Sequence, residues 1–233
     1  MKILGLIPAR KGSKGIKDKN ITKLGKLPLI EHTFKFVSAL DHVDKFILST
    51  DSEKIIEISN KYPMIDTPFK RPNNLCTDHA NISDVAIHAI DECNKIYNTI
   101  FTHIALFQPT SPFRNLDEVN GAINTLIKNN HDSIFSVNPV IHHPSEYITI
   151  SKNSYKVVLP PKSKDEQRQQ YDNVYFINGS FYMCSAKFLR QNKSFLTPSS
   201  QPVIFSKYSS FDIDDEFDLE LARQNIENNE EKY

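Results

Sequence analysis

The feature that most limits the possible folds is a regular alternation of short apolar runs with apolar stripes at helical spacing. The runs that fit buried strands are residues 3–7, 46–48, 102–107 and 133–137. The helical stripes cover residues 29–40, 55–58, 82–93 and 119–127. Strands that alternate with helices form parallel sheets with helices on both faces, because each crossover is right-handed. We therefore expect one α/β domain over residues 1–233, built on a mostly parallel sheet flanked by helices.

The alternation stops between about residues 139 and 175. Prolines and a polar run at 162–170 favour a surface excursion or a lid in this stretch. Within it, residues 147–150 and 155–159 have the composition of a β-hairpin. We expect an inserted arm that contacts a second subunit or a substrate.

Helix starts are also predicted from polar residues that can cap them. Thr50 with Glu53 fits a capping box, and Asn81 fits an N-cap. Asn115 with Glu118 fits a third start.

A basic, glycine-containing loop follows the first predicted strand. It runs from Arg10 to Asn20 and contains five cations and two glycines. Glycines let backbone N–H groups approach a ligand and form an anion-binding concavity, while Arg and Lys neutralise phosphate charge. The order of residues matches neither the P-loop nor the dinucleotide-binding pattern. The loop therefore predicts a polyphosphate site, with a solvated basic loop as the alternative.

Two carboxylates near the far end of the chain form the second informative site. In extended backbone, Asp212 and Asp214 point to the same face, about 7 Å apart, and suit a hard cation such as Mg²⁺. The alternative is that Asp214 or Asp215 caps the last helix. A triphosphate-binding loop and a magnesium-binding diacid together indicate nucleotidyl transfer.

Overall charge and cysteine usage exclude several classes. The 28 basic and 28 acidic residues balance, so global charge gives no reason to expect binding of nucleic acid or of an anionic membrane. Three scattered cysteines lack metal-ligand spacing and suggest reduced thiols. The basic cluster follows the first apolar run, which is the wrong order for a signal peptide, and no run has transmembrane length. We expect a cytoplasmic protein.

Five motifs, in order, resemble those of the acylneuraminate cytidylyltransferases, also called CMP–sialic acid synthetases. They are the string P-A-R-x-G-S-K-G-I-x-x-K-N from Pro8, Arg71-Pro72 with Asp78, Gln108-Pro109-Thr110-Ser111-Pro112 with Arg114, Arg168-Gln169 with Tyr175 and Asn178-Gly179, and Asp212-Ile213-Asp214. Lys11 stands where the family commonly has glycine. A single motif match carries a high risk of chance, whereas an ordered set across most of the chain does not.

The resemblance implies a Rossmann-like nucleotidyltransferase fold and a specific reaction. The enzyme would transfer CMP from CTP to the anomeric hydroxyl of a nonulosonic acid such as sialic or legionaminic acid, and release pyrophosphate. It would act as a homodimer, with the arm after Pro139 reaching the neighbouring site. By position, CTP would be held by Arg10, Gly12, Ser13, Lys19, Asn20 and Arg71, Mg²⁺ by Asp212 and Asp214, and the sugar acid by Gln108, Arg168, Gln169, Tyr175 and Asn178. The catalytic residues would be Arg10, Lys19 and Asp214.

One departure and several alternatives stay open. Ile82 stands where the family often has a serine that contacts cytosine, so Asn81, Ser83 or backbone groups would have to read the base. Tyr175 and Asn178 also fit turn and core packing, and Gln108 fits backbone bonding in a proline-rich turn. Rival functions are CMP activation of an eight-carbon octulosonic acid and non-catalytic nucleotide binding on the same scaffold.

Overall fold

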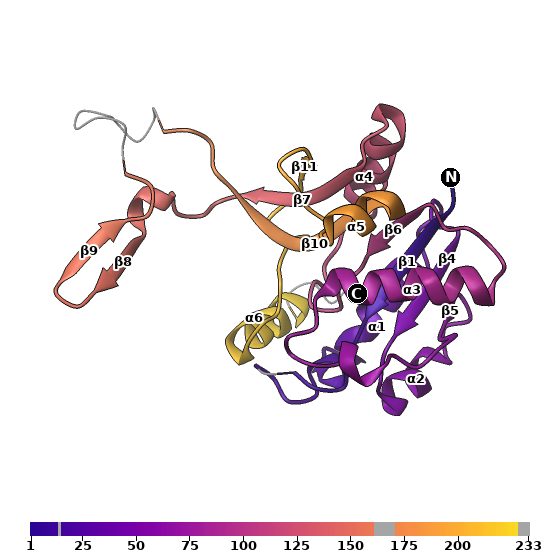
Figure 1. Cartoon of the computed structure of the whole chain (residues 1–233). Helices are drawn as coiled ribbons and strands as arrows, with labels where there is room; N and C mark the ends of the chain where they lie inside the picture. The colour runs from indigo at the N-terminus through magenta and orange to yellow at the C-terminus, as the bar shows by residue number, and fades with distance from the viewer. Residues whose placement is uncertain (14, 161–170, 228–233) are drawn as a thin grey trace.

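A seven-stranded sheet forms the centre of the part of the chain that the structure, a computed structural model, describes: residues 1–13, 15–160 and 171–227. Its strands are β1 (Ile3–Pro8), β4 (Lys45–Ser49), β5 (Ile65–Asp66), β6 (His103–Leu106), β7 (Ser133–Pro139), β10 (Tyr175–Ser185) and β11 (Gln201–Ile204). The helices are α1 (Leu29–Val37), α2 (Glu53–Ser59), α3 (Ile82–Ile96), α4 (Leu116–Asn129), α5 (Ala186–Asn192) and α6 (Glu216–Glu227) (Figure 1). Short 3-10 turns, η1 (Lys19–Ile21), η2 (Asn73–Leu75) and η3 (Pro144–Glu146), lie in the connections.

The sheet has the order β11-β7-β10-β6-β1-β4-β5 and is mostly parallel, as the alternation of strands and helices predicts. β1 lies between β6 and β4 and is parallel to both. β10 is the exception, because it is antiparallel to both β6 and β7. The carboxyl ends of β1, β4 and β6 therefore meet at one edge, which is where α/β sheets bind ligands.

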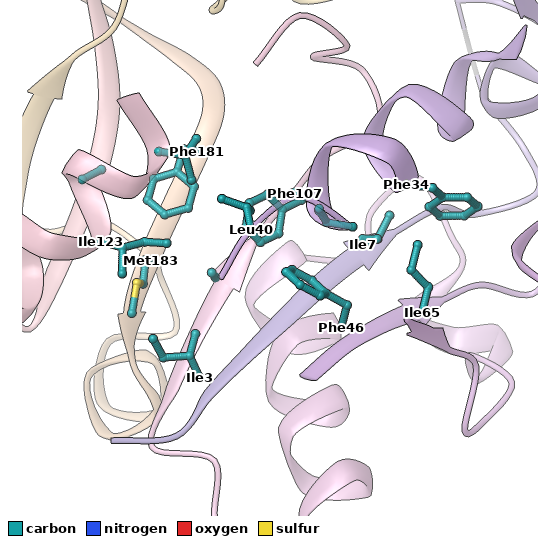
Figure 2. Packing of buried hydrophobic residues seen from close by; sticks show 14 of the residues in the cluster. Ile3, Ile7, Phe34, Leu40, Phe46, Ile65, Phe107, Ile123, Phe181 and Met183 are labelled. Atoms are coloured by element: carbon teal, nitrogen blue, oxygen red, sulfur yellow. The ribbon is translucent and has the colours of Figure 1, made fainter. Parts of the chain in front are cut away.

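Alternate residues of the central strands pack into two separate hydrophobic layers. Ile3 and Ile7 of β1 face the layer that contains α1, α2 and α4, whereas Leu4 and Leu6 face the layer that contains α3 and α5. This is the two-residue period of a strand that is buried on both faces. In the first layer Phe107 stands between Phe46 and Phe181, with ring centroids 5.8 and 5.7 Å away (Figure 2).

A third apolar cluster joins the two ends of the chain. Leu219, Ala222 and Ile226 of α6 pack against Ile16 in the basic loop, together with Leu24 of the small β2–β3 ribbon (Lys23–Leu24 and Leu27–Pro28). Ile213 is fully buried in the same cluster. The last helix therefore supports both the basic loop and the diacid segment.

The predicted hairpin in the arm is confirmed. β8 (Ile148–Ser151) and β9 (Ser154–Val157) pair as an antiparallel ribbon outside the main sheet. Figure 1 shows this ribbon far from the helices, beyond the extended ends of β7 and β10. The polar run predicted at 162–170, with Arg168 and Gln169, lies outside the described residues.

Two of the three predicted helix caps are confirmed, and one is wrong. Asn81 accepts a hydrogen bond from Ser83 N, and Asn115 accepts one from Glu118 N, each at the start of its helix. The Thr50–Glu53 capping box does not form, because α2 starts after Ser52 and the Thr50 hydroxyl accepts the Ser52 N–H instead.

Among the described residues, no helix has both the length and the apolar character needed to span a bilayer.

Candidate nucleotide and acceptor site

The basic loop leaves β1 at Pro8 and is fixed by contacts to neighbouring segments. Ala9 N donates to Ser49 O at the end of β4, and Lys11 N donates to the Asp51 carboxylate at 2.7 Å. Inside the loop, Asn20 Nδ2 donates to Arg10 O at 3.1 Å. These bonds hold the loop open over the carboxyl edge of the sheet.

A cavity of about 240 Å³ lies against this loop. Its wall includes seven residues that the sequence assigns to the substrates: Arg10, Gly12, Ser13, Lys19, Asn20, Arg71 and Gln108. An added Cβ at Gly12 would meet no atom within 4 Å, so the cavity is open next to the glycine backbone. This is the kind of space that a phosphate chain needs beside backbone N–H groups.

The basic loop and the diacid segment meet, although 194 residues separate them in the chain. Lys19 Nζ donates to Ile213 O at 2.7 Å and lies 3.5 Å from the Asp214 carboxylate. Gly15 is packed so closely that a Cβ there would lie 2.2 Å from Asp214 O. Only glycine allows this approach of the two backbones, so the contact is encoded in the loop sequence.

The two aspartates of the diacid are not used to cap α6. That role belongs to Asp215, whose Oδ1 accepts from Phe217 N at 2.9 Å and from Asp218 N at 3.0 Å. The predicted capping alternative is therefore confirmed for Asp215 and wrong for Asp214. Asp212 is half-buried and accepts from the Ser111 hydroxyl at 3.3 Å, while the Asp214 side chain is 81% exposed.

Burial raises the pKa of the Asp212 carboxyl, and a hydrogen bond from Thr110 opposes this rise. The negative charge of Asp214 raises the Asp212 pKa further. The described residues contain no group of three or more His, Cys, Asp or Glu side chains placed to hold a metal. A cation at this diacid would need phosphate oxygens and waters as further ligands, which is how Mg²⁺ is usually bound beside a nucleotide.

Two arginines at the cavity already have partners. Arg10 Nη1 lies 2.5 Å from Asp78 Oδ1 across the cavity wall. Arg71 is buried and donates to Ser49 Oγ at 3.0 Å and to Ser49 O at 2.5 Å. Arg71 therefore anchors the segment after β5 to the end of β4 from within the cavity wall.

A second cavity, of about 210 Å³, shares Ile82 and Gln108 with the first. Asn81 and Ser83 line this second cavity but not the first, and the Asn81 side chain is engaged in capping α3. Within the described residues, the buried Ser83 hydroxyl has no hydrogen-bond partner. Neither Asn81 nor Ser83 therefore lines the cavity beside the basic loop, and how the base is read stays open between them and backbone groups.

The second cavity also contains residues that the motifs do not indicate. Tyr182 comes from β10, and Lys193 and Ser194 follow α5. No spacing rule marks them, because they reach the site only through the antiparallel insertion of β10 beside β6. Only the turn before them, Asn178-Gly179, is a sequence signal in this region.

The predicted sugar-binding set is only partly brought together. Gln108 lies between the two cavities, and its Nε2 donates to Gly179 O at 3.1 Å. Asn178 is instead buried within the bulge of β10, where its Oδ1 accepts from Ser136 Oγ and Ser180 N. Tyr175 is 42% exposed at the arm end of β10, and neither it nor Asn178 is among the described residues that line the two cavities.

Comparison with known proteins identifies the family. Residues 4–224 match a family model described as cytidylyltransferase. The chain belongs to the cytidylyltransferase family. This confirms the resemblance seen in the motifs and the mostly parallel nucleotidyltransferase fold.

Known relatives of this cytidylyltransferase act on sugar acids, as their names state. A CMP-N,N'-diacetyllegionaminic acid synthase from Legionella pneumophila is 32% identical over 99% of both chains. An N-acylneuraminate cytidylyltransferase from Escherichia coli is 32% identical over 95% of this chain and 51% of its own length. The fold is also that of a CMP:2-keto-3-deoxy-manno-octonic acid synthetase solved with CTP, with a TM-score of 0.70 at 12% identity over 98% and 100% of the two chains.

Proposed function

We propose that this enzyme transfers CMP from CTP to the anomeric hydroxyl of a nonulosonic acid and releases pyrophosphate. The observation that carries the proposal is the contact between Lys19 and the diacid segment, because Lys19 also lines the cavity beside the basic loop and so links the two segments. Relatives that are named for legionaminic and N-acylneuraminic acids support a nine-carbon acceptor. The octulosonic enzyme shares only the fold at 12% identity, so the eight-carbon rival has weaker support.

In this proposal the chain contributes position and charge. Arg10 and Lys19 neutralise the phosphates, and the backbone at Gly12 and Ser13 donates N–H groups to them. Asn20 holds the loop by its bond to Arg10 O. Such positioning and charge neutralisation are most of what phosphoryl transfer requires.

We assign the magnesium site to Asp212 and Asp214. The fit rests on two carboxylates that lie two residues apart, whose charges interact and which α6 does not use for capping. Mg²⁺ bound there would draw negative charge from the phosphates and the leaving pyrophosphate. In the transfer itself, the bond from the anomeric oxygen to the α-phosphorus forms while the bond from that phosphorus to the bridging oxygen of pyrophosphate breaks.

We assign the acceptor to the second cavity. It adjoins the nucleotide cavity, and Gln108 lies on the boundary between them. Lys193 supplies a cation that suits the carboxylate of a sugar acid. Arg168 and Gln169 lie outside the described residues, so their part in acceptor binding stays a prediction.

We also propose a homodimer that acts in the cytoplasm, where CTP is available. The arm and the adjoining strands expose many large apolar side chains: Ile141, Ile148, Ile150, Tyr155, Val158, Phe176 and Ile204. Exposed apolar surface of this extent marks an interaction site. Sedimentation of Ile150→Asp beside the wild type tests the dimer, and a wild-type monomer would refute it.

Pyrophosphate release from CTP with a panel of sialic, legionaminic, pseudaminic and octulosonic acids tests the reaction. We expect release with a nine-carbon acid; release only with the octulosonic acid, or with none, would reject the proposal. Asp214→Asn tests the metal role: turnover should fall by more than about 100-fold while CTP binding persists in weakened form. Glu220→Gln, an exposed carboxylate change on α6, is the matched control. Normal activity in Asp214→Asn would remove the metal role.

A further inference from the structure

Arg114 is a buried cation that the reaction described above does not use. Arg114 is 7% exposed, and among the described residues its guanidinium donates to neutral oxygens alone. These acceptors are Ser180 O at 2.7 Å, Ser111 O at 2.7 Å, Gln108 O at 2.5 Å and Thr33 Oγ1 at 3.3 Å. In the described part of the chain, no carboxylate forms an ion pair with it. A buried charge without a paired anion is costly, so a protein retains one only where it has a role.

The four hydrogen bonds tie together three segments. Gln108 and Ser111 are two positions of one proline-rich turn, and Arg114 holds both of their carbonyls. Ser180 belongs to β10, and Thr33 belongs to α1. A neutral side chain could not offer three nitrogen atoms in one plane to carbonyls that arrive from three directions.

The two turn residues that Arg114 holds, Gln108 and Ser111, each contact a part of the proposed site. The Gln108 side chain bonds to Gly179 O, next to the carbonyl of Ser180 that Arg114 holds. The Ser111 hydroxyl bonds to the Asp212 carboxylate at 3.3 Å, and Ile213 N donates to Thr110 O. The guanidinium thus lies one hydrogen bond away from the acceptor glutamine and two away from the first diacid carboxylate.

Electrostatics link the same two groups. Burial lowers the pKa of the Arg114 guanidinium to about 9, and the negative charge of Asp212 opposes this change. Arg114 therefore remains charged at neutral pH, and its charge interacts with that of the Asp212 carboxylate.

We propose that Arg114 is a positioning residue that fixes Gln108 and Asp212 relative to each other without touching either substrate. The inference rests on the proposed function, because it assumes that Gln108 faces the acceptor and Asp212 the metal. Arg114 has no role in holding CTP, because the proposed function assigns the phosphates to the loop after β1. Loss of the guanidinium fork should therefore impair acceptor use and metal binding, and leave the affinity for CTP alone.

Arg114→Lys tests the proposal, because lysine keeps the charge but loses the planar fork. We expect kcat/KM for the acceptor to fall roughly 10- to 100-fold, since a misplacement of about 1 Å has effects of this size. The Kd for CTP, measured by calorimetry without acceptor, should change less than about threefold. Arg190→Lys is the matched control, because Arg190 is exposed on α5 and pairs with Asp91 at the surface.

A second readout does not depend on turnover. Mn²⁺ binding to the CTP complex, followed by electron paramagnetic resonance, should weaken about five- to tenfold in Arg114→Lys and remain unchanged in Arg190→Lys. Wild-type Mn²⁺ affinity in Arg114→Lys, or a loss of CTP affinity that parallels the loss of activity, would overturn the proposal. If the wild type releases no pyrophosphate with any acid, the proposed function fails, whereas the Mn²⁺ titration still decides the role of Arg114.

Discussion

Gly15→Ala should push the basic loop and the diacid segment apart without changing any side chain that is assigned to a substrate or to the metal. The added Cβ would lie 2.2 Å from Asp214 O, where ordinary contact begins at 3.4 Å. One backbone must therefore move by about 1 Å. The bond from Lys19 Nζ to Ile213 O, 2.7 Å long, belongs to the same contact and cannot survive such a shift.

The size of the effect follows from that overlap. Overpacking against backbone costs about 1–3 kcal/mol, and in a domain of this size each kcal/mol lowers Tm by roughly 2–4 °C. Misplacement by about 1 Å at a site of reaction lowers the rate by around 100-fold. We expect Gly15→Ala to lower both Tm and kcat/KM, measured by thermal denaturation and by pyrophosphate release.

A glycine elsewhere supplies the control. Gly121 lies on α4, and a Cβ there would meet no atom within 4 Å. Gly121→Ala should leave activity unchanged and stabilise the protein by about 0.5–1 kcal/mol, because alanine loses less backbone entropy in a helix. If Gly15→Ala matched the wild type in both Tm and kcat/KM, the argument that the close approach couples loop and diacid would be wrong.

Three further predictions test single contacts. Asp78→Asn frees Arg10 from an ion pair of two partly exposed side chains worth about 0.2–1 kcal/mol, so CTP should bind up to about fivefold more tightly by calorimetry; weaker binding would contradict this. Asn178→Ala removes the acceptor of the buried Ser180 N–H and one of the two acceptors of the Ser136 hydroxyl, so stability to urea should fall by about 1–3 kcal/mol while the acceptor KM stays unchanged; a raised KM with normal stability would instead support the sugar-binding role. Burial acts to raise the pKa of Asp44, but hydrogen bonds from Lys2 and a backbone N–H outweigh it and leave the pKa below its usual value. A carboxyl group with a lowered pKa stabilises the folded protein above its unfolded pKa, which is near 4, and this stabilisation is lost as pH falls through the folded pKa. The difference in unfolding free energy between the wild type and Asp44→Asn should therefore be full at about pH 6 and shrink below about pH 4. A difference that stays constant with pH would contradict the assignment.

The sheet could be predicted because its signal is local. Short continuous apolar runs such as residues 3–7, followed by helical stripes, predict a parallel α/β sheet. That the basic loop and the diacid lie at one site is predictable from chemistry, because a triphosphate and its cation need both. The antiparallel direction of β10 could not be predicted, because the chain returns from the arm before it enters the sheet. No residue pattern in Tyr175–Ser185 distinguishes an antiparallel strand from a parallel one.

Other placements could not be predicted for the same reason. Asn178 reads as a turn residue or a ligand, and only the bulge of β10 shows that its amide oxygen faces Ser136 and Ser180. Tyr182 and Lys193 carry no local pattern, and they join the second cavity through tertiary placement alone. Thr50 was assigned to a capping box because the box is defined by spacing, whereas the helix begins after Ser52.

The packing of α6 has a consequence for the order in which the site can assemble during synthesis. Ile16 and Ile213 share an apolar support that does not exist until α6 has emerged from the ribosome. A nascent chain can therefore assemble most of its sheet while the loop that would receive the nucleotide still lacks its partner. Completion of the proposed site therefore depends on the last helix to be made.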